Sequence, residues 1–159
     1  MSQAPYFRPE QIVSGGQTGV DRGALDVAIA LGIPHGGWCP KGRLAEDGRI
    51  PARYQLVETE SSDYPVRTER NVLDSDATLI LFCSQLSGGT ELTLRLAERH
   101  AKPWLAADLR QPTPPLDAIR RWLSECRPKT LNIAGPRESQ CPGVAAEAAA
   151  LLTELFGAS

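Results

Sequence analysis

Two short glycine-rich segments have the composition to bind an anion. Residues 14–19 read SGGQTG, and residues 87–91 read SGGTE. Glycine lets backbone N–H groups come close to a ligand, and a helix that begins after such a loop adds free N–H donors and the positive end of its dipole. Both segments therefore predict phosphate binding. The plainer alternative is a tight turn, which needs glycine in any case.

The first segment does not match the common nucleotide motifs. Its spacing is Gly15-Gly16-x-x-Gly19, whereas the dinucleotide fingerprint is Gly-x-Gly-x-x-Gly. No Gly-Lys-Ser or Gly-Lys-Thr occurs anywhere in the chain, as a P-loop requires. The segment is therefore neither an ordinary dinucleotide fingerprint nor the phosphate loop of a P-loop ATPase.

Side chains in and beside the first segment could either contact a ligand or only stabilise the start of the next helix. The Thr18 hydroxyl could donate to a phosphate, and Gln17 lies within the same loop. Asp21 could accept from a ribose hydroxyl or a pterin N–H, or act as a general base, with Arg22 stabilising developing charge. Alternatively, Thr18 and Asp21 form a capping box at the start of the next helix.

The second segment leaves the same choice open. Ser87, the two glycines Gly88 and Gly89, and Thr90 could hold a phosphate in the way expected of the first segment. Glu91 could accept from a sugar hydroxyl or act as a general base. It could equally favour the helix dipole or form an i,i+4 pair with Arg95.

Cations that could offset the charge of an anion occur in two further loops. Residues 134–139 read AGPRES, and Arg137 there offers a planar fork for phosphate or carboxylate. Residues 38–49 read WCPKGRLAEDGR, with Lys41, Gly42 and Arg43 in the middle. The alternative in both loops is a solvated charge without a specific partner.

Strand and helix patterns alternate along the whole chain. Strands are expected at residues 12–13, 35–38, 55–58, 77–84, 104–107 and 130–135, and helices at 20–31, 66–74, 90–100, 115–125 and from Pro142 onward. This alternation predicts an α/β fold, a single domain over residues 1–159 with one doubly wound, mainly parallel sheet and helices on both faces. Residues 77–84, apolar throughout, are the expected central strand. The loops after the strands should then meet at one edge of the sheet.

Composition narrows the function classes. The 159 residues are 42% hydrophobic and 23% charged, with a net charge of −2, which argues against nucleic acid as a partner. No apolar run approaches the ~20 residues needed to cross a bilayer, and residues 1–11 lack a signal-peptide core. We therefore expect a cytoplasmic protein that does not engage a membrane.

The four cysteines, Cys39, Cys83, Cys126 and Cys141, are widely spaced, without a C-x-x-C or a Cys/His cluster. No metal site is predicted from this spacing. Cys83 and Cys126 fall in apolar patterns and are expected to be buried as small hydrophobes. No disulfide is expected in a reducing compartment.

Several motifs in order resemble the family of putative molybdenum carrier proteins. The motifs are GGQTGVDRGALD, GGWCPKGRLAEDGRIP, YPVRTERNVLDSDATLIL, GGTELT and LNIAGPRES, and the likeness runs from about residue 11 to residue 155. That family is similar to the SLOG superfamily of Rossmann-like proteins, which includes the lonely-guy phosphoribohydrolases and the DNA-processing protein DprA. The lonely-guy motif is P-G-G-x-G-T-x-x-E, whereas Glu91 here follows Thr90 directly.

The resemblance implies a Rossmann-like sheet that binds a nucleotide or a nucleotide-like ligand. It also implies a set of ligand contacts: Gly15, Gly16, Gln17, Thr18, Gly19, Asp21, Arg22, Lys41, Gly42, Arg43, Arg67, Thr68, Asn71, Gly88, Gly89, Thr90 and Glu91. Arg67, Thr68 and Asn71 enter only through this resemblance, because spacing alone would not select them.

Three functions follow as hypotheses. The first is a cytoplasmic protein that binds a phosphate-bearing small molecule, either a nucleotide or the molybdenum cofactor. The second is a hydrolase of the phosphoribohydrolase or N-glycosidase type, with Asp21 or Glu91 as the general base. The third is an interaction module that senses a ligand. The identity of the ligand stays open, as does a homo-oligomeric state.

Overall fold

The computed structural model describes residues 7–157, and its centre is a parallel sheet of five strands in the order β2-β1-β9-β7-β8. The strands of this sheet are β1 (Gln11–Val13), β2 (His35–Gly36), β7 (Ala77–Phe82), β8 (Trp104–Asp108) and β9 (Thr130–Ala134). The helices are α1 (Val20–Leu31), α2 (Tyr64–Leu73), α3 (Gly88–Arg99), α4 (Leu116–Cys126) and α5 (Val144–Phe156). The predicted α/β class with a mainly parallel sheet is confirmed.

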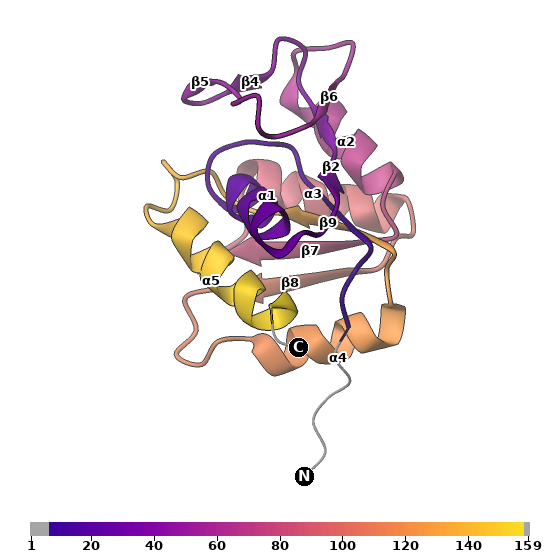
Figure 1. The fold of residues 1–159 in the computed structure, drawn as a ribbon, viewed down its shortest axis with the longest axis vertical. Helices are drawn as coiled ribbons and strands as arrows, with labels where there is room; N and C mark the ends of the chain where they lie inside the picture. Colours follow the sequence, from indigo (N-terminus) through magenta and orange to yellow (C-terminus); the bar gives the residue numbers. More distant parts are fainter. Residues whose placement is uncertain (1–6, 158–159) are drawn as a thin grey trace.

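The sheet lies between two helical layers (Figure 1). Right-handed crossovers place a helix on one face when the chain moves one way across the sheet, and on the other face when it moves back. The largest apolar core joins the sheet to buried residues of α1, α4 and α5. A second core joins Val72 of α2 to Leu96 and Ala97 of α3, with Trp104 packed against it. The expected doubly wound arrangement is therefore present.

Residues 77–84 contain an interior strand buried on both faces, as expected, although the middle position of the five-stranded sheet belongs to β9. Strand β7 is interior, but it lies between β9 and β8. Both strands bury most of their residues, so apolarity does not distinguish them. The order of the strands depends on the crossovers, which a strand's own sequence does not reveal.

Two helices begin differently from the sequence prediction. The N-cap of α1 is Gly19, without a side-chain capping bond, and the Thr18 hydroxyl contacts the Glu46 carboxylate instead. The predicted capping role of Thr18 is therefore wrong. Helix α5 begins at Val144, and its N-cap is Gly143. Gly143 has a φ of 89°, in the left-handed region, and so lies outside the helix. Pro142 thus lies outside the helix rather than at its first position.

A small lobe lies between β2 and α2. It contains a parallel pair, β3 (Trp38–Cys39) with β6 (Val57–Glu58), and a hairpin of β4 (Leu44–Ala45) and β5 (Gly48–Arg49). Figure 1 shows the hairpin extending beyond α1. The hairpin was not predicted, because strands of two residues are too short to show an alternating pattern.

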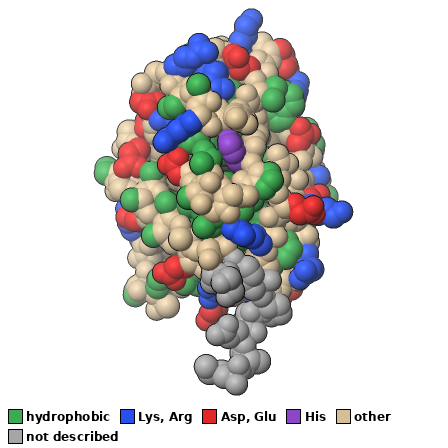
Figure 2. Space-filling view, in the orientation of Figure 1, with side chains coloured by type: hydrophobic (Ala, Val, Ile, Leu, Met, Phe, Trp, Pro, Cys, Tyr) green, Lys and Arg blue, Asp and Glu red, His purple; other side chains and the backbone are tan. Residues whose placement is uncertain are grey.

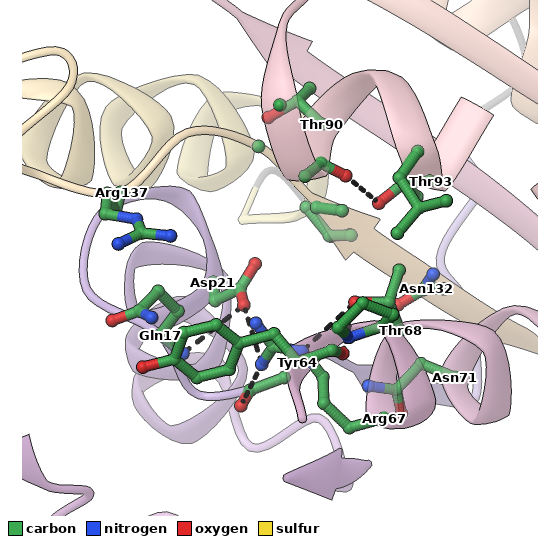
Figure 3. Close-up of a pocket in the computed structure, with 18 of the residues that line it drawn as sticks. Gln17, Asp21, Tyr64, Arg67, Thr68, Asn71, Thr90, Thr93, Asn132 and Arg137 are labelled. Atoms are coloured by element: carbon green, nitrogen blue, oxygen red, sulfur yellow. Dashed lines mark hydrogen bonds and ion pairs between the residues drawn. The ribbon is translucent and has the colours of Figure 1, made fainter. Parts of the chain in front are cut away.

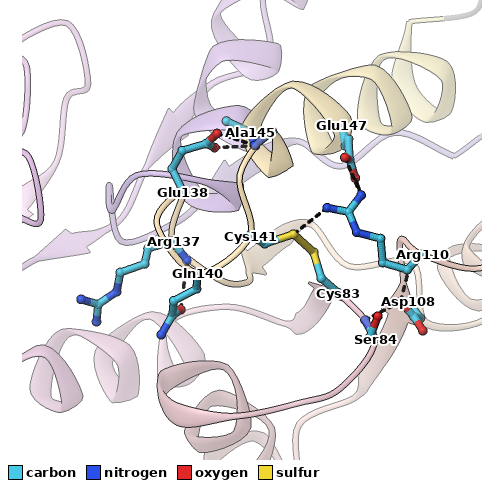
Figure 4. Close-up of a disulfide and its surroundings, with 11 residues drawn as sticks. Cys83, Ser84, Asp108, Arg110, Arg137, Glu138, Gln140, Cys141, Ala145 and Glu147 are labelled. Carbon is cyan, nitrogen blue, oxygen red and sulfur yellow. Dashed lines mark hydrogen bonds and ion pairs between the residues drawn. A yellow bond between two sulfur atoms is a disulfide. The ribbon is translucent and has the colours of Figure 1, made fainter.

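The structure contains a disulfide between Cys83 and Cys141 (Figure 4). The expectation of no disulfide is wrong, and Cys83 is not simply a buried hydrophobe. The bond forms because the ends of β7 and β9 meet at one edge of the sheet, although the two cysteines are 58 residues apart in sequence. Cys39 and Cys126 are free.

No helix within residues 7–157 is both long and apolar enough to cross a membrane. Acidic and basic side chains are interspersed over the face of the molecule that Figure 2 shows.

Candidate functional site

A polar cavity of about 270 Å³ lies at the carboxyl edge of the sheet (Figure 3). Its walls come from the loops after β1, β7 and β9 and from one side of α2. The lining residues are Gly15, Gln17, Asp21, Tyr64, Pro65, Arg67, Thr68, Asn71, Gly88, Gly89, Thr90, Leu92, Thr93, Asn132, Ile133, Ala134, Gly135, Arg137 and Gln140. The three loops selected from the sequence therefore meet in space.

A buried carboxylate and a buried guanidinium lie side by side in this cavity. Asp21 is 7% exposed and Arg67 is 8% exposed. Arg67 Nη1 lies 3.8 Å from Asp21 Oδ2, and the Gln17 N–H donates to the same oxygen at 3.3 Å. Burial raises the pKa of Asp21 to about 6, although Arg67 and backbone N–H groups act in the opposite direction. This carboxyl group can therefore exchange a proton near neutral pH.

Arg67 is held in place from several sides. Its Nη1 donates to the Gly15 carbonyl oxygen at 2.8 Å, and its Nε donates to Thr68 Oγ1 at 3.1 Å. The Thr68 hydroxyl in turn donates to the Tyr64 carbonyl oxygen at 3.0 Å. The Arg67 guanidinium also lies 5.3 Å from the centre of the Tyr64 ring. Helix α2 is thereby fixed as the fourth wall of the cavity.

Gln17 presents an unpaired donor at this cavity. Its Oε1 accepts from the Thr18 N–H at 3.0 Å and from the Glu46 N–H at 2.8 Å. These two bonds fix the orientation of the amide, so that Nε2 is the free end. Nε2 is buried and has no hydrogen-bond partner within residues 7–157. A buried donor without a partner costs about 1–3 kcal/mol, and an acceptor on a ligand would satisfy it.

Arg137 brings a second cation to the cavity. Its guanidinium lies 5.7 Å from the centre of the Tyr64 ring. No carboxylate lies within ion-pair distance of it in the described part of the chain. In Figure 3 its guanidinium points toward the interior of the drawn site. This charge is therefore available to an anion.

The start of α3 forms an open side of the cavity. Its N-cap, Ser87, makes no side-chain capping bond. A Cβ added at Gly88 or Gly89 would meet no atom within 4 Å. Thr90 is buried at the cavity wall. This helix N-terminus can therefore receive a ligand group without a steric obstacle.

The predicted site residues divide into two groups. The cavity is lined by Gly15, Gln17, Asp21, Arg67, Thr68, Asn71, Gly88, Gly89, Thr90 and Arg137. The lining does not include Gly16, Thr18, Gly19, Arg22, Lys41, Gly42, Arg43, Ser87 or Glu91.

Residues outside the cavity have structural contacts of their own. Glu91 pairs with Arg95, as the plainer interpretation had it. Arg22 donates to the Gly16 carbonyl oxygen at 3.0 Å and pairs with Asp47. Arg43 donates to three backbone carbonyl oxygens of the lobe.

Three predicted glycines outside the cavity have close contacts of their own, and Lys41 is exposed. Gly19 lies so close to Pro136 that an added Cβ would be 2.2 Å from its carbonyl oxygen. At Gly16 the corresponding atom would be 2.6 Å from Leu56. The Gly42 N–H donates to Glu58 at 2.6 Å, and Lys41 is exposed.

Sequence reasoning missed several wall residues. Tyr64 and Pro65 begin the YPVRTERNVLDSDATLIL motif, and Asn132 and Gly135 lie in the LNIAGPRES motif. The position of these residues within the family motifs was the signal that could have selected them. Asn132 Nδ2 donates to Thr78 Oγ1 at 3.3 Å, inside the sheet.

Fold and cavity together define a Rossmann-like α/β protein with a polar cavity at the carboxyl edge of its sheet. The chain belongs to the circularly permutated YpsA SLOG family, whose model matches residues 12–156. The chain is also similar to a solved structure, that of the "Putative molybdenum carrier protein" from Syntrophus aciditrophicus SB. The sequence identity is 51% and the TM-score 0.89, over 94% of this chain and 96% of the other. No curated protein sequence matches the chain.

Proposed function

We propose that this cavity binds a phosphate-bearing small molecule, either a nucleotide or the molybdenum cofactor, in a cytoplasmic single-domain protein. The observation that carries the proposal is Gln17, a lining residue whose buried Nε2 has no hydrogen-bond partner among residues 7–157. Arg137 adds a cation with no carboxylate within ion-pair distance in the described part of the chain, and the start of α3 adds an open helix N-terminus. All three features favour an anionic group with several acceptor oxygens.

The size of the cavity favours a small ligand. About 270 Å³ is near the lower end of ligand pockets, which span about 300–1,000 Å³. A ligand of mononucleotide size suits this volume better than a dinucleotide.

The name of the similar solved protein refers to molybdenum, but the described residues do not suit a directly bound metal ion. Residues 7–157 contain no group of three or more His, Cys, Asp or Glu side chains that could hold a metal ion. The donors at this cavity suit phosphate oxygens instead. A molybdenum-bearing pterin would therefore be held through its phosphate, with Gln17 and Arg137 as contacts.

Calorimetric titration with inorganic phosphate, AMP and GMP tests this proposal. Arg137→Gln should weaken binding about tenfold or more, as expected for a charge-assisted hydrogen bond worth about 1.5–3 kcal/mol. Lys41→Gln removes the same charge at an exposed residue outside the cavity and should leave binding unchanged. Mass spectrometry of molecules released from the purified protein, with molybdenum counted in the same sample, would identify the ligand class. Equal effects of the two variants would contradict the proposed site.

A second candidate function, hydrolysis of a nucleotide or an N-glycosidic bond, rests on Asp21. Its raised pKa and its place at the cavity suit a general base. Asp21→Asn should then abolish turnover of a nucleotide while largely sparing its binding. Glu91→Gln is the matched control, because Glu91 pairs with Arg95 outside the cavity. If the wild-type protein forms no product from any nucleotide that it binds, the hydrolase function is excluded and only the binding function stands.

A further inference from the structure

The Cys83–Cys141 disulfide joins two of the segments that form the cavity. Cys83 directly follows β7, in the connection that leads to Gly88 and Gly89 at the start of α3. Cys141 directly follows Gln140, a lining residue, in the connection between β9 and α5. The Cα atoms of the two cysteines are 6.7 Å apart. The bond therefore sets the spacing between two cavity walls that have no other covalent link nearby.

The two sulfur atoms differ in their surroundings. Cys141 is 5% exposed, whereas Cys83 is only partly buried. Arg110 Nη2 lies 2.9 Å from Cys141 Sγ and donates toward it (Figure 4). The same guanidinium pairs with Glu147 through Nη1, and that pair fixes its position. A neighbouring cation stabilises a thiolate relative to a thiol, so Cys141 is the better leaving group.

We propose that Cys83 and Cys141 are a reversible redox pair whose state controls the width of the cavity. The exchange partner is a low-molecular-weight thiol and its disulfide. The thiolate of that partner attacks Cys83 Sγ, the bond between the cysteines breaks, and Cys141 leaves as a thiolate beside Arg110. A second thiolate then attacks the partner sulfur of the mixed disulfide and releases Cys83. The cysteine pair gains two electrons, the partner thiols are oxidised to one disulfide, and solvent supplies protons to the released thiolates.

The redox pair is an inference independent of the ligand, whereas its effect on binding rests on the proposed function. Reduction frees the β7–α3 connection from the β9–α5 connection. The open N-terminus of α3 and Arg137 can then move apart, and an anion that contacts both loses one set of donors. We therefore expect the oxidised protein to bind phosphate-bearing ligands more tightly than the reduced protein.

Thiol trapping across a series of glutathione redox buffers, read by mass spectrometry, tests the pair in the full-length protein. With the protein unfolded at the trapping step, so that the buried Cys39 also reacts, Cys83 and Cys141 should change together from unreactive to alkylated as the buffer becomes more reducing. Cys39 and Cys126 should be alkylated in every buffer. Arg110→Gln should slow reduction by about three- to tenfold, because Cys141 then leaves as a less stable thiolate. Arg121→Gln, an exposed change on α4, is the matched control and should not alter the rate. Free thiols at Cys83 and Cys141 in the most oxidising buffer would overturn the proposal.

Hydrogen exchange tests the link to the cavity without a ligand. On reduction, exchange should accelerate about tenfold in residues 83–90 and 135–143, and stay unchanged in residues 116–126. A variant with both Cys83→Ser and Cys141→Ser should resemble the reduced protein. Unchanged exchange in both connections after complete reduction would overturn control of the cavity. If no phosphate ligand binds the oxidised or the reduced protein, the proposed function is contradicted. Thiol trapping and hydrogen exchange would still test the redox pair.

Discussion

Arg67 Nη1 donates a hydrogen bond to the Gly15 carbonyl oxygen at 2.8 Å and thereby joins α2 to the loop after β1. The two residues are 52 positions apart in sequence. A Cβ at residue 15 would lie 2.0 Å from the same Nη1. Glycine therefore leaves room here for the guanidinium of Arg67, which a larger residue would displace.

Gly15→Ala is expected to displace Arg67. A forced shift in a packed interior costs about 1–3 kcal/mol, and the wall that Arg67 helps to form is lost with it. Urea unfolding should report the lower stability, and calorimetry should report weaker binding of phosphate ligands. Wild-type stability in Gly15→Ala would contradict the contact.

Gly89→Ala is the matched comparison for Gly15→Ala. A Cβ at Gly89 meets no atom within 4 Å, and its φ is not in the left-handed region. The residue lies in the first turn of α3, where alanine is favoured over glycine by up to about 1 kcal/mol. Urea unfolding should therefore show equal or higher stability for this variant. A lower stability would contradict the open space beside Gly89.

Asp21 should make stability depend on pH between its two pKa values. Burial raises the pKa of Asp21 from 3.8 to about 6 in the folded protein. The folded state then binds more protons than the unfolded state in this window, so stability falls as pH rises from about 4 to about 6. The loss is about 3 kcal/mol, because one pKa unit corresponds to about 1.4 kcal/mol. Asp21→Asn should flatten this part of the profile in urea unfolding at a series of pH values.

The same carboxyl group should link anion binding to proton uptake. An anion close to Asp21 disfavours its ionised form and raises its pKa further. Affinity for a phosphate ligand should therefore increase as pH falls from about 7 to about 6. Calorimetry in buffers of different ionisation enthalpy measures the protons taken up. Because a phosphate has its own second pKa near 6, the contribution of Asp21 is the difference in proton uptake between the wild type and Asp21→Asn. Equal uptake by the two proteins would contradict the placement of the anion beside Asp21.

Gln17→Glu isolates the unpaired donor. A glutamate keeps an oxygen to accept from Thr18 and Glu46 and replaces Nε2 with a second oxygen. An anion that accepts from Nε2 in the wild type would then meet a negative charge, and its affinity should fall more than tenfold. Gln55→Glu makes the same change at an exposed residue and should leave calorimetric affinity unchanged.

The disulfide should contribute measurably to stability. In the chain-entropy account, a bond across 58 residues stabilises the folded state by about 4 kcal/mol. Reduction of the wild-type protein should therefore lower its urea midpoint, and the double serine variant at Cys83 and Cys141 should not respond to reductant. A wild-type midpoint that is the same with and without reductant would exclude this contribution.

The sequence by itself determined the class of fold and much of the site. The alternation of apolar strands with periodic helices was enough for an α/β sheet, because backbone hydrogen bonding and burial depend on local pattern. Loops that follow parallel strands emerge at one edge of the sheet. The loops after residues 12–13, 77–84 and 130–135 could therefore be predicted to lie close together. Gln17, Gly89 and Arg137 were placed in this way, and all line the cavity.

Only the tertiary structure decided which side chains face the cavity. Lys41 and Glu91 have suitable chemistry but point into solvent or to a neighbour on the same helix. Arg67 lies far from the glycine loop in sequence and reaches it because α2 packs over the sheet edge. The Cys83–Cys141 bond and the central place of β9 likewise depend on the path of the chain across the sheet. Sequence pattern specifies the elements, whereas their rotation and order come from long-range packing that no local pattern contains.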